Sequence, residues 1–482
     1  MTSSSPPTPS FATASWGQLF SGRNGWLALA LTGGVALHAI NVHIVTTVLP
    51  SVVADIGGLD WYAWSTTLFV VTSIIGAALS VRFLAALGPR GAYLLALGVF
   101  ALGSVACASA PSMAWMLAGR SVQGFGGGML AALSYALIRV VFVPALWPRA
   151  VALVSGMWGV ATLCGPAVGG LFAQAGHWRW AFWALLPVAV WQAFLVSWQL
   201  GANEHESGQQ EQGAPQVASL QIALLAASVL AVAGGSLSTQ LPWQGLGVVL
   251  GLGLGAAAIA VDRRNQGGRG VCLLPDGATH TATALGGIYA CVALLLLGTT
   301  TEIFVPYFLQ TLHGLSPLAA GYLTAAMAAG WSAGSLLSSG RSGAMAVTLQ
   351  RVGPILCAVS LLALGVLIPL DAAAWPAALL LSLFALALAG VGAGVGMGWP
   401  HLLTRVLTVA PKGQEDMASA AITTVQLYGM AIGAALAGLV ANMAGLTQPG
   451  GVAGAQSAAA WLFVLFALAP AYTAWLLHRQ LK

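Results

Sequence analysis

The stretch GVATLCGPAVGG, residues 159–170, decides the fold of this chain. It lies inside an almost wholly apolar run, residues 150–173, that is long enough to cross a lipid bilayer as a helix. Glycine and proline are the least favourable residues in a helix interior, yet the stretch contains Pro166 and four glycines. A bend or a close contact must therefore offset their cost.

The composition of the whole chain requires a lipid environment. Of its 482 residues 58% are hydrophobic and 6% are charged, whereas about 25% are charged in an ordinary soluble domain. Runs of roughly 20 apolar residues mark spanning helices. They predict an all-α polytopic membrane protein with fourteen spans, near residues 25–50, 61–84, 91–109, 112–138, 150–173, 179–200, 218–239, 245–261, 282–311, 316–338, 352–370, 376–398, 417–442 and 457–477.

The basic residues predict the orientation of these spans. If the amino terminus is cytoplasmic, alternation places all of the 16 Lys and Arg residues on the inner side except Arg120, inside a span, and Arg179, at an outer boundary. This is a strong positive-inside bias, and it predicts that both termini are cytoplasmic. The net charge of +5 then reflects topology, and without a clustered basic stripe we expect no nucleic-acid partner.

Two polar segments, residues 201–216 and 262–281, divide the predicted spans into six, two and six. Paired bundles with a substrate site between them are typical of transporters. The predicted domains are a disordered cytoplasmic tail (1–24), a first six-helix bundle (25–200), a linker region with two extra helices (201–281) and a second six-helix bundle (282–482). The five cysteines are odd in number and scattered, so they predict neither a disulfide framework nor a metal site.

Two embedded charges are candidates for function. Glu302 is the single acid predicted deep inside a span, where a lone carboxyl is expensive and usually functional. We expect it to take up and release protons; the alternative is a structural carboxyl paired with a neighbouring helix. Arg120 is the single embedded base, at a similar depth in the other bundle, and a guanidinium keeps its proton. It can bind a substrate anion, tune a carboxyl or hold backbone carbonyls.

Other polar residues lie at unusual depths. The first predicted span places His38 and Asn41 on one face and His43 with neighbouring threonines on another, so it should border a cavity or be enclosed by protein. Trp158 and Trp331 lie mid-span, where packing between helices is the simpler explanation and a wet cavity the alternative. HExxH, nucleophile-elbow, phosphate-loop and CxxC motifs are missing, and the sequence therefore predicts no enzyme.

With these residues in place, the chain resembles the major facilitator superfamily, and within it the fourteen-helix drug:proton antiporters. The segment GMWGVATLCGPAVGG is similar to the antiporter motif of the fifth span, through Gly156, Gly159, Gly165, Pro166, Gly169 and Gly170. Three further segments are similar to family motifs: the fourth-span motif at Arg120, Gln123 and Gly124, the WRW segment 178–180, and PYFLQTLHGLSPLAAGY at 306–322. The resemblance implies the major facilitator fold, with two six-helix bundles and two linker helices. It also implies that Gly165 and Pro166 bend the fifth span while its glycines lie against the other bundle and seal one face of the cavity.

The chain departs from this family at two places. Members usually carry an Asp where this chain has Asn41, and Thr and Asn where it has His43 and Thr46. The loop after the second span usually bears an Asp that pairs with an Arg, but the nearest register gives Ala85, ahead of Arg90. The first departure weakens an inference of cationic drug recognition, and the second weakens the usual inward gate or requires another contact in its place.

These patterns predict a monomeric transporter of the bacterial cytoplasmic (inner) membrane. It would export small amphipathic compounds or drugs in exchange for protons by alternating access, with the proton gradient and no cofactor. Glu302 would carry the proton, with Arg120 as its electrostatic partner. The cavity candidates are Asn41, His43, Gln123, Trp158, Tyr307 and Gln310. Two alternatives remain open: a dedicated exporter of a metabolite or siderophore-like anion held by Arg120, and a membrane sensor without turnover.

Overall fold

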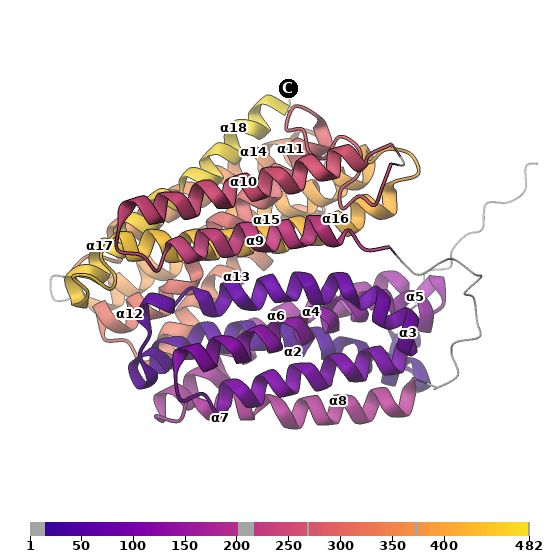
Figure 1. The fold of residues 1–482 in the computed structure, drawn as a ribbon, viewed down its shortest axis with the longest axis horizontal. Coiled ribbons are helices and arrows are strands. Elements are labelled where there is room, and N and C mark those ends of the chain that lie inside the picture. The colour runs from indigo at the N-terminus through magenta and orange to yellow at the C-terminus, as the bar shows by residue number, and fades with distance from the viewer. Residues whose placement is uncertain (1–14, 201–215, 268, 372–374, 481–482) are drawn as a thin grey trace, which may run out of the picture.

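The computed structural model describes residues 15–200, 216–267, 269–371 and 375–480, and every regular element in these ranges is a helix. Figure 1 shows two groups of helices, with the first part of the chain below and the rest above. The first group contains α1 (Trp16–Phe20), α2 (Gly22–Ile56), α3 (Trp64–Ala108), α4 (Met113–Ala136), α5 (Ile138–Val141), α6 (Trp147–Gln174), α7 (Arg179–Trp183) and α8 (Leu185–Gln199), with the short 3-10 helices η1 (Leu59–Trp61) and η2 (Pro144–Leu146).

The second group begins after residues 201–215, which lie outside the described residues. It contains α9 (Ser219–Gly235), α10 (Leu241–Asn265), α11 (Ala284–Thr299), η4 (Thr300–Phe304), α12 (Val305–His313), α13 (Pro317–Ser339), α14 (Gly343–Leu367), α15 (Ala377–Val409), α16 (Glu415–Met443), α17 (Gly451–Phe466) and α18 (Leu468–Gln480). The two groups correspond to the two expected bundles, with α9 and α10 on the side of the second (Figure 1).

Eleven segments of the described chain are long and apolar enough to span a membrane, so the expected count of fourteen is not confirmed. The segment Leu59–Ala108 counts once although it turns at Gly88, whose φ of 69° and ψ of 177° interrupt the helix. A positive φ favours glycine, and Pro89 follows directly. The apolar helix Ser219–Gly235 has 17 residues and falls short of a span, and α13 does not reach the hydropathy of the eleven.

Part of the predicted amino-terminal tail is helical. Residues 1–14 lie outside the described residues, but Trp16–Phe20 forms α1. The side chains of Ser15 and Gln18 each accept a hydrogen bond from the backbone N–H of the other residue, which makes a capping box. The expectation of disorder over 1–24 is therefore wrong for this turn, because a Ser-x-x-Gln start signal satisfies the first orphan amides.

Glycines hold neighbouring helices close inside each bundle, as expected for helices packed in lipid. A Cβ atom at Gly126 or Gly128 of α4 would collide with the backbone of α3 at Phe100 or Ser73. In the second bundle, the glycine-dense segment 390–400 of α15 packs in the same way. There a Cβ at Gly392 would meet the backbone of α13 at Met327. Close helix packing thus explains both glycine runs.

Candidate functional site at the bundle interface

The site is built around a break in the helix that carries Glu302. Helix α11 ends at Thr299, and η4 continues the path as a tighter 3-10 helix before α12 begins. Pro306 has no backbone N–H, so it cannot donate to the Glu302 carbonyl, which accepts from Val305 instead. The hydroxyl of Thr300 donates to the Leu297 carbonyl at 2.7 Å. The proline thus loosens the helix beside Glu302.

Glu302 faces His43 of α2 across the interface of the two bundles. The carboxylate Oε1 of Glu302 lies 3.9 Å from Nδ1 of His43. Both side chains are largely buried, but 25% of the Glu302 side chain and 11% of the His43 side chain remain exposed. An acid and an ionisable imidazole therefore meet at a partly accessible point between the bundles, a position suited to proton transfer.

Arg120 lies elsewhere, inside the first bundle. Its side chain is 1% exposed, its Nε donates to the Ser65 carbonyl at 3.3 Å, and its Nη1 donates to Gln123 Oε1 at 2.5 Å. The Gln123 amide in turn donates to the Ser104 hydroxyl at 2.8 Å. The guanidinium also stacks over the Phe69 ring, 4.0 Å from its centroid. Arg120 and Gln123 thus bind α3 to α4, and the ionisable group beside Glu302 is His43 rather than Arg120.

The glycines of α6 pack against the other helices at one end of the interface. A Cβ atom at Gly165 would collide with His43, and one at Gly169 would approach the Ile44 carbonyl of α2 at 2.9 Å. A Cβ at Gly170 would come within 2.6 Å of the Leu318 Cα in α13, which belongs to the second bundle. From α13, a Cβ at Gly321 would meet Thr47 at 2.7 Å and Pro166 at 3.2 Å.

Aromatic and polar contacts join the bundles at this same end, which we call the closed end and define by Tyr62, Phe304, Tyr307, Leu318 and Asn442. Tyr62 is fully buried, stacks on Phe304 with a centroid distance of 4.9 Å and meets Tyr307 edge-on at 5.5 Å. The Asn442 amide donates to the Asp60 carbonyl at 3.1 Å. Side chains from both bundles therefore close the interface here.

Toward the opposite end, which we call the open end, the glycines of α6 have no such close neighbours. The helical repeat of 3.6 residues places Gly159 on the face of α6 that carries Pro166 and Gly170. A Cβ at Gly159 would nevertheless meet nothing within 4 Å, and the same holds for Gly156. Trp158 is 39% exposed and lies 6.0 Å from His38 between ring centroids. The same face of α6 therefore seals the closed end at Gly170 and borders free space at Gly159, in the other half of the helix.

One charged contact bridges the bundles beyond this space. Arg139 of α5 lies 3.9 Å from Asp416 in the first turn of α16, and both side chains are mostly exposed. Exposed ion pairs contribute little to stability, so this contact can open at small cost. Asp416 thus supplies an acid at the end of the molecule where the loop after the second span has Ala85 in place of the usual Asp.

The cavity candidates divide between these regions. Asn41 is fully buried, and neither atom of its amide has a hydrogen-bond partner among the described residues. Such an amide is available to a polar group of a ligand. Trp158 borders the open space, whereas Tyr307 belongs to the closed end and Gln123 to the Arg120 cluster. The Gln310 side-chain nitrogen is buried without a partner in the described part of the chain.

Comparison with known proteins agrees with this geometry. The family model described as Major Facilitator Superfamily matches residues 31–434. The chain belongs to the Major Facilitator Superfamily. It is therefore a membrane protein of a family of secondary transporters for small molecules.

Relatives in the superfamily carry efflux names. A probable multidrug-efflux transporter of Mycobacterium tuberculosis is 40% identical over 436 residues, covering 90% of both chains. Multidrug resistance protein 3 of Bacillus subtilis is 23% identical and covers 86% of this chain and 79% of its own. Among solved structures, a POT family transporter in complex with a peptide conjugate has a TM-score of 0.67 at 13% identity, over 95% of this chain and 96% of its own. That likeness shows the major facilitator fold.

An ion pair that the sequence patterns left unexplained stabilises the first bundle of this superfamily member. Arg179 of the WRW segment donates to Asp55 at 2.6 Å and to the Ala110 carbonyl at 2.9 Å. The Trp178 indole donates to the same Asp55 carboxylate at 3.1 Å. The sequence contained a signal for this ion pair, because Arg179 is one of the two bases that depart from the positive-inside pattern. Asp55 lies at the end of the first span.

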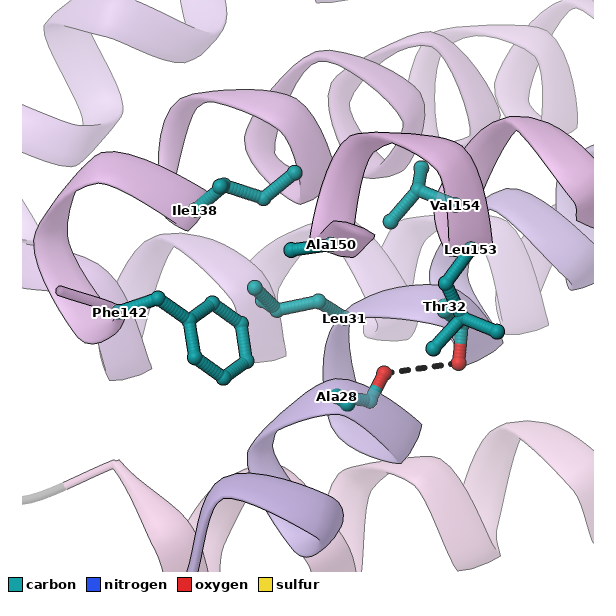
Figure 2. A pocket seen from close by; sticks show the side chains of 8 residues that line it. All are labelled: Ala28, Leu31, Thr32, Ile138, Phe142, Ala150, Leu153 and Val154. Atoms are coloured by element: carbon teal, nitrogen blue, oxygen red, sulfur yellow. Dashed lines mark hydrogen bonds between the residues drawn. The ribbon is translucent and has the colours of Figure 1, made fainter. Parts of the chain in front are cut away.

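A small apolar recess lies among helices of the first bundle (Figure 2). It lies between α2, α5 and α6, leaves no space for a water molecule, and is lined by Ala28, Leu31, Thr32, Ile138, Phe142, Ala150, Leu153 and Val154. The Thr32 hydroxyl already donates to the Ala28 carbonyl at 2.8 Å. The recess therefore offers no free polar group to orient a ligand. Within the described residues no cluster of His, Cys, Asp or Glu is suited to hold a metal ion.

Proposed function

We propose that this chain is a proton-coupled antiporter that exports small amphipathic compounds, including drugs, from the bacterial cytoplasm. The observation that carries the proposal is the approach of Glu302 to His43, at 3.9 Å between the two bundles. The efflux names of the relatives support the direction and the substrate class. The proton gradient drives the cycle without a cofactor, and one chain is sufficient for it.

The pair can couple a proton to bundle movement. When Glu302 is ionised and His43 protonated, opposite charges hold the two bundles together at this point. Protonation of Glu302 removes that attraction, and a substrate bound beside the pair favours loss of the proton. Because each charge state favours a different separation of the bundles, proton and substrate are exchanged by alternating access.

The positive-inside rule assigns the two ends of the interface. It places the amino and carboxyl termini in the cytoplasm and the closed end, with Tyr62 and Phe304, on the outer side. The open end with Gly159 then lies on the cytoplasmic side of the membrane, the side from which a substrate would enter. Arg120 is enclosed and already bonded to Ser65 and Gln123, so the geometry gives no support to export of an anion bound by Arg120.

Transport by purified protein in proteoliposomes tests the proposal. An imposed pH gradient should drive uptake of lipophilic test compounds such as ethidium, and Glu302→Gln should abolish that uptake while the variant remains folded. Glu415→Gln is the matched control, because Glu415 is an exposed acid in the first turn of α16. Gradient-driven transport by Glu302→Gln at the rate of the control would refute the carrier role.

A further inference from the structure

The interface between the bundles has two lateral edges, and each edge is a pair of helices from opposite bundles. One edge is formed by α3 and α16, and the other by α6 and α13; in both cases the two helices are in contact. We call them the α3–α16 seam and the α6–α13 seam. A substrate dissolved in the membrane would have to pass one of these seams to reach the space between the bundles.

Helix α9 covers the α3–α16 seam. A separate apolar cluster joins the three helices there: Phe69, Val70, Val71 and Ile74 from α3, Ile222, Ala226, Val229, Val232 and Ala233 from α9, and Ala431, Ala435 and Leu439 from α16. Every member of this cluster is buried. Because side chains of α9 fill the groove between two helices that belong to different bundles, the seam is closed from the side.

Hydrogen bonds attach α9 to α16. The Ser228 hydroxyl and the Tyr428 hydroxyl are 2.8 Å apart and share a hydrogen bond. At the end of α9, the Asn442 amide donates to the Ser236 carbonyl at 3.1 Å. The contact of α9 with α3 is apolar and therefore non-directional. Because α9 is hydrogen-bonded to α16 but only packs against α3, it can move with the second bundle while the first bundle slides past it.

Helix α10 packs closely along one side of α9 (Figure 1). A Cβ atom at Gly247 of α10 would approach the Ala231 carbonyl of α9 at 2.8 Å, so the two backbones lie close together. The opposite side of α10 is open, since Val249 is 68% exposed and a Cβ at Gly253 would meet nothing within 4 Å. Figure 1 shows α10 running beside α9, and α9 contacts α16. Helix α9 thus lies over the seam, and α10 supports α9 from the side.

The α6–α13 seam has no such cover in the described part of the chain. Leu163 of α6 is 65% exposed and Leu336 of α13 is 77% exposed. A Cβ atom at Gly156 or Gly159 of α6 would meet nothing within 4 Å. The two seams, equivalent in a protein of two similar bundles, are therefore unlike in their access to the membrane.

We propose that α9 is a lateral seal that closes the α3–α16 seam, and that the α6–α13 seam is the passage by which a lipid-dissolved amphipathic substrate enters. The passage rests on the proposed transport function; the seal does not. The extra helical pair then has a role beyond linking the bundles: it makes lateral access one-sided.

Cysteine labelling tests the seal without any turnover. Cys107, Cys164, Cys272, Cys291 and Cys357 are first replaced by alanine, and a single cysteine is placed at Gly159 or at Ala435. A maleimide tethered to a lipid should modify Gly159→Cys, and should modify Ala435→Cys at least about tenfold more slowly. Truncating the cover with Ile222→Ala and Val229→Ala should raise the rate at Ala435→Cys.

The control for truncation is Leu230→Ala, which shortens a side chain on the exposed side of α9 and should leave the labelling rate unchanged. Size-exclusion chromatography confirms that each variant is folded. Equal labelling of Ala435→Cys and Gly159→Cys in the intact protein would overturn the seal. Continued protection after truncation of Ile222 and Val229 would overturn it too, because α9 would not be the cover.

Transport tests the passage. Complete modification of Gly159→Cys by the lipid-tethered maleimide should stop transport of a lipophilic compound. The same modification of Gly253→Cys, on the open side of α10, should leave transport unchanged. Unimpaired transport after labelling at Gly159→Cys would refute the passage. If unmodified protein does not transport at all, the proposed function fails while the labelling result for the seal still stands.

Discussion

Glu302 and His43 come from opposite bundles and meet 3.9 Å apart at the interface. The pair lies next to the contact that seals the closed end, because Gly165 of α6 packs against the same His43. A change of charge at Glu302 therefore acts directly at the surface on which the bundles separate.

Replacing His43 by Gln should weaken coupling between protons and transport. The variant keeps a polar side chain but loses the charge that attracts ionised Glu302. Coupling between two sites is typically worth 5- to 150-fold, and we expect proton-driven accumulation of substrate to fall about tenfold. The measurement is the steady-state accumulation ratio in proteoliposomes at fixed pH gradient. His401→Gln on α15 is the control, and equal accumulation by both variants would exclude His43 from coupling.

The glycines of α6 should differ sharply in their tolerance of alanine. Gly165→Ala places a methyl group into His43, so the closed end cannot form and transport should be lost. Gly156→Ala adds the same methyl group to free space and should retain near-normal transport. Parallel transport assays and expression levels check the contrast. Normal transport by Gly165→Ala would show that this contact does not seal the interface.

The free space at the open end should close in the opposite conformation. Gly159 lies on the α6 face that contacts α13 at the closed end, and Ser332 is exposed on the α13 face that carries Gly321. A Gly159→Cys/Ser332→Cys pair in the cysteine-free chain should therefore cross-link when the bundles rock to the other state. Cross-linking should increase when substrate and a pH gradient drive turnover. A yield independent of turnover would contradict movement of these helices.

The Asp55 and Arg179 pair should stabilise the first bundle without taking part in coupling. Arg179 holds both Asp55 and the Ala110 carbonyl, and lysine cannot reproduce this forked contact. Arg179→Lys should lower the melting temperature by a few degrees, an effect reduced by salt because the pair is partly exposed. Scanning fluorimetry at low and high salt measures it. A proton to substrate ratio altered in this variant would disagree with a purely structural role.

The sequence predicted the local properties of the site better than its pairings. The glycines and Pro166 of α6 signalled close contact with another helix, and the structure places Gly170 against Leu318 of the second bundle. The depth of Glu302 also followed from residue types. These are properties of one helix at a time, which composition and helical periodicity determine.

The pairing of Glu302 with His43 could not be predicted in this way. It depends on how two helices from different bundles are rotated against each other, and periodicity within one helix does not contain that information. Arg120 has a similar depth, but its side chain turns to Ser65 and Gln123 inside its own bundle. The span count had a different limit, since Gly88 joins two helices through one turn and α9 is too short for a span.

Proton release on substrate addition tests the central claim most directly. Purified protein in weak buffer would receive lipophilic cations, anions and neutral compounds in turn, with a pH-sensitive dye as the readout. The account predicts that a transported compound releases protons from the intact protein and from Glu415→Gln, and none from Glu302→Gln. Binding with undiminished proton release in Glu302→Gln, or binding by the intact protein with no proton release, would contradict it.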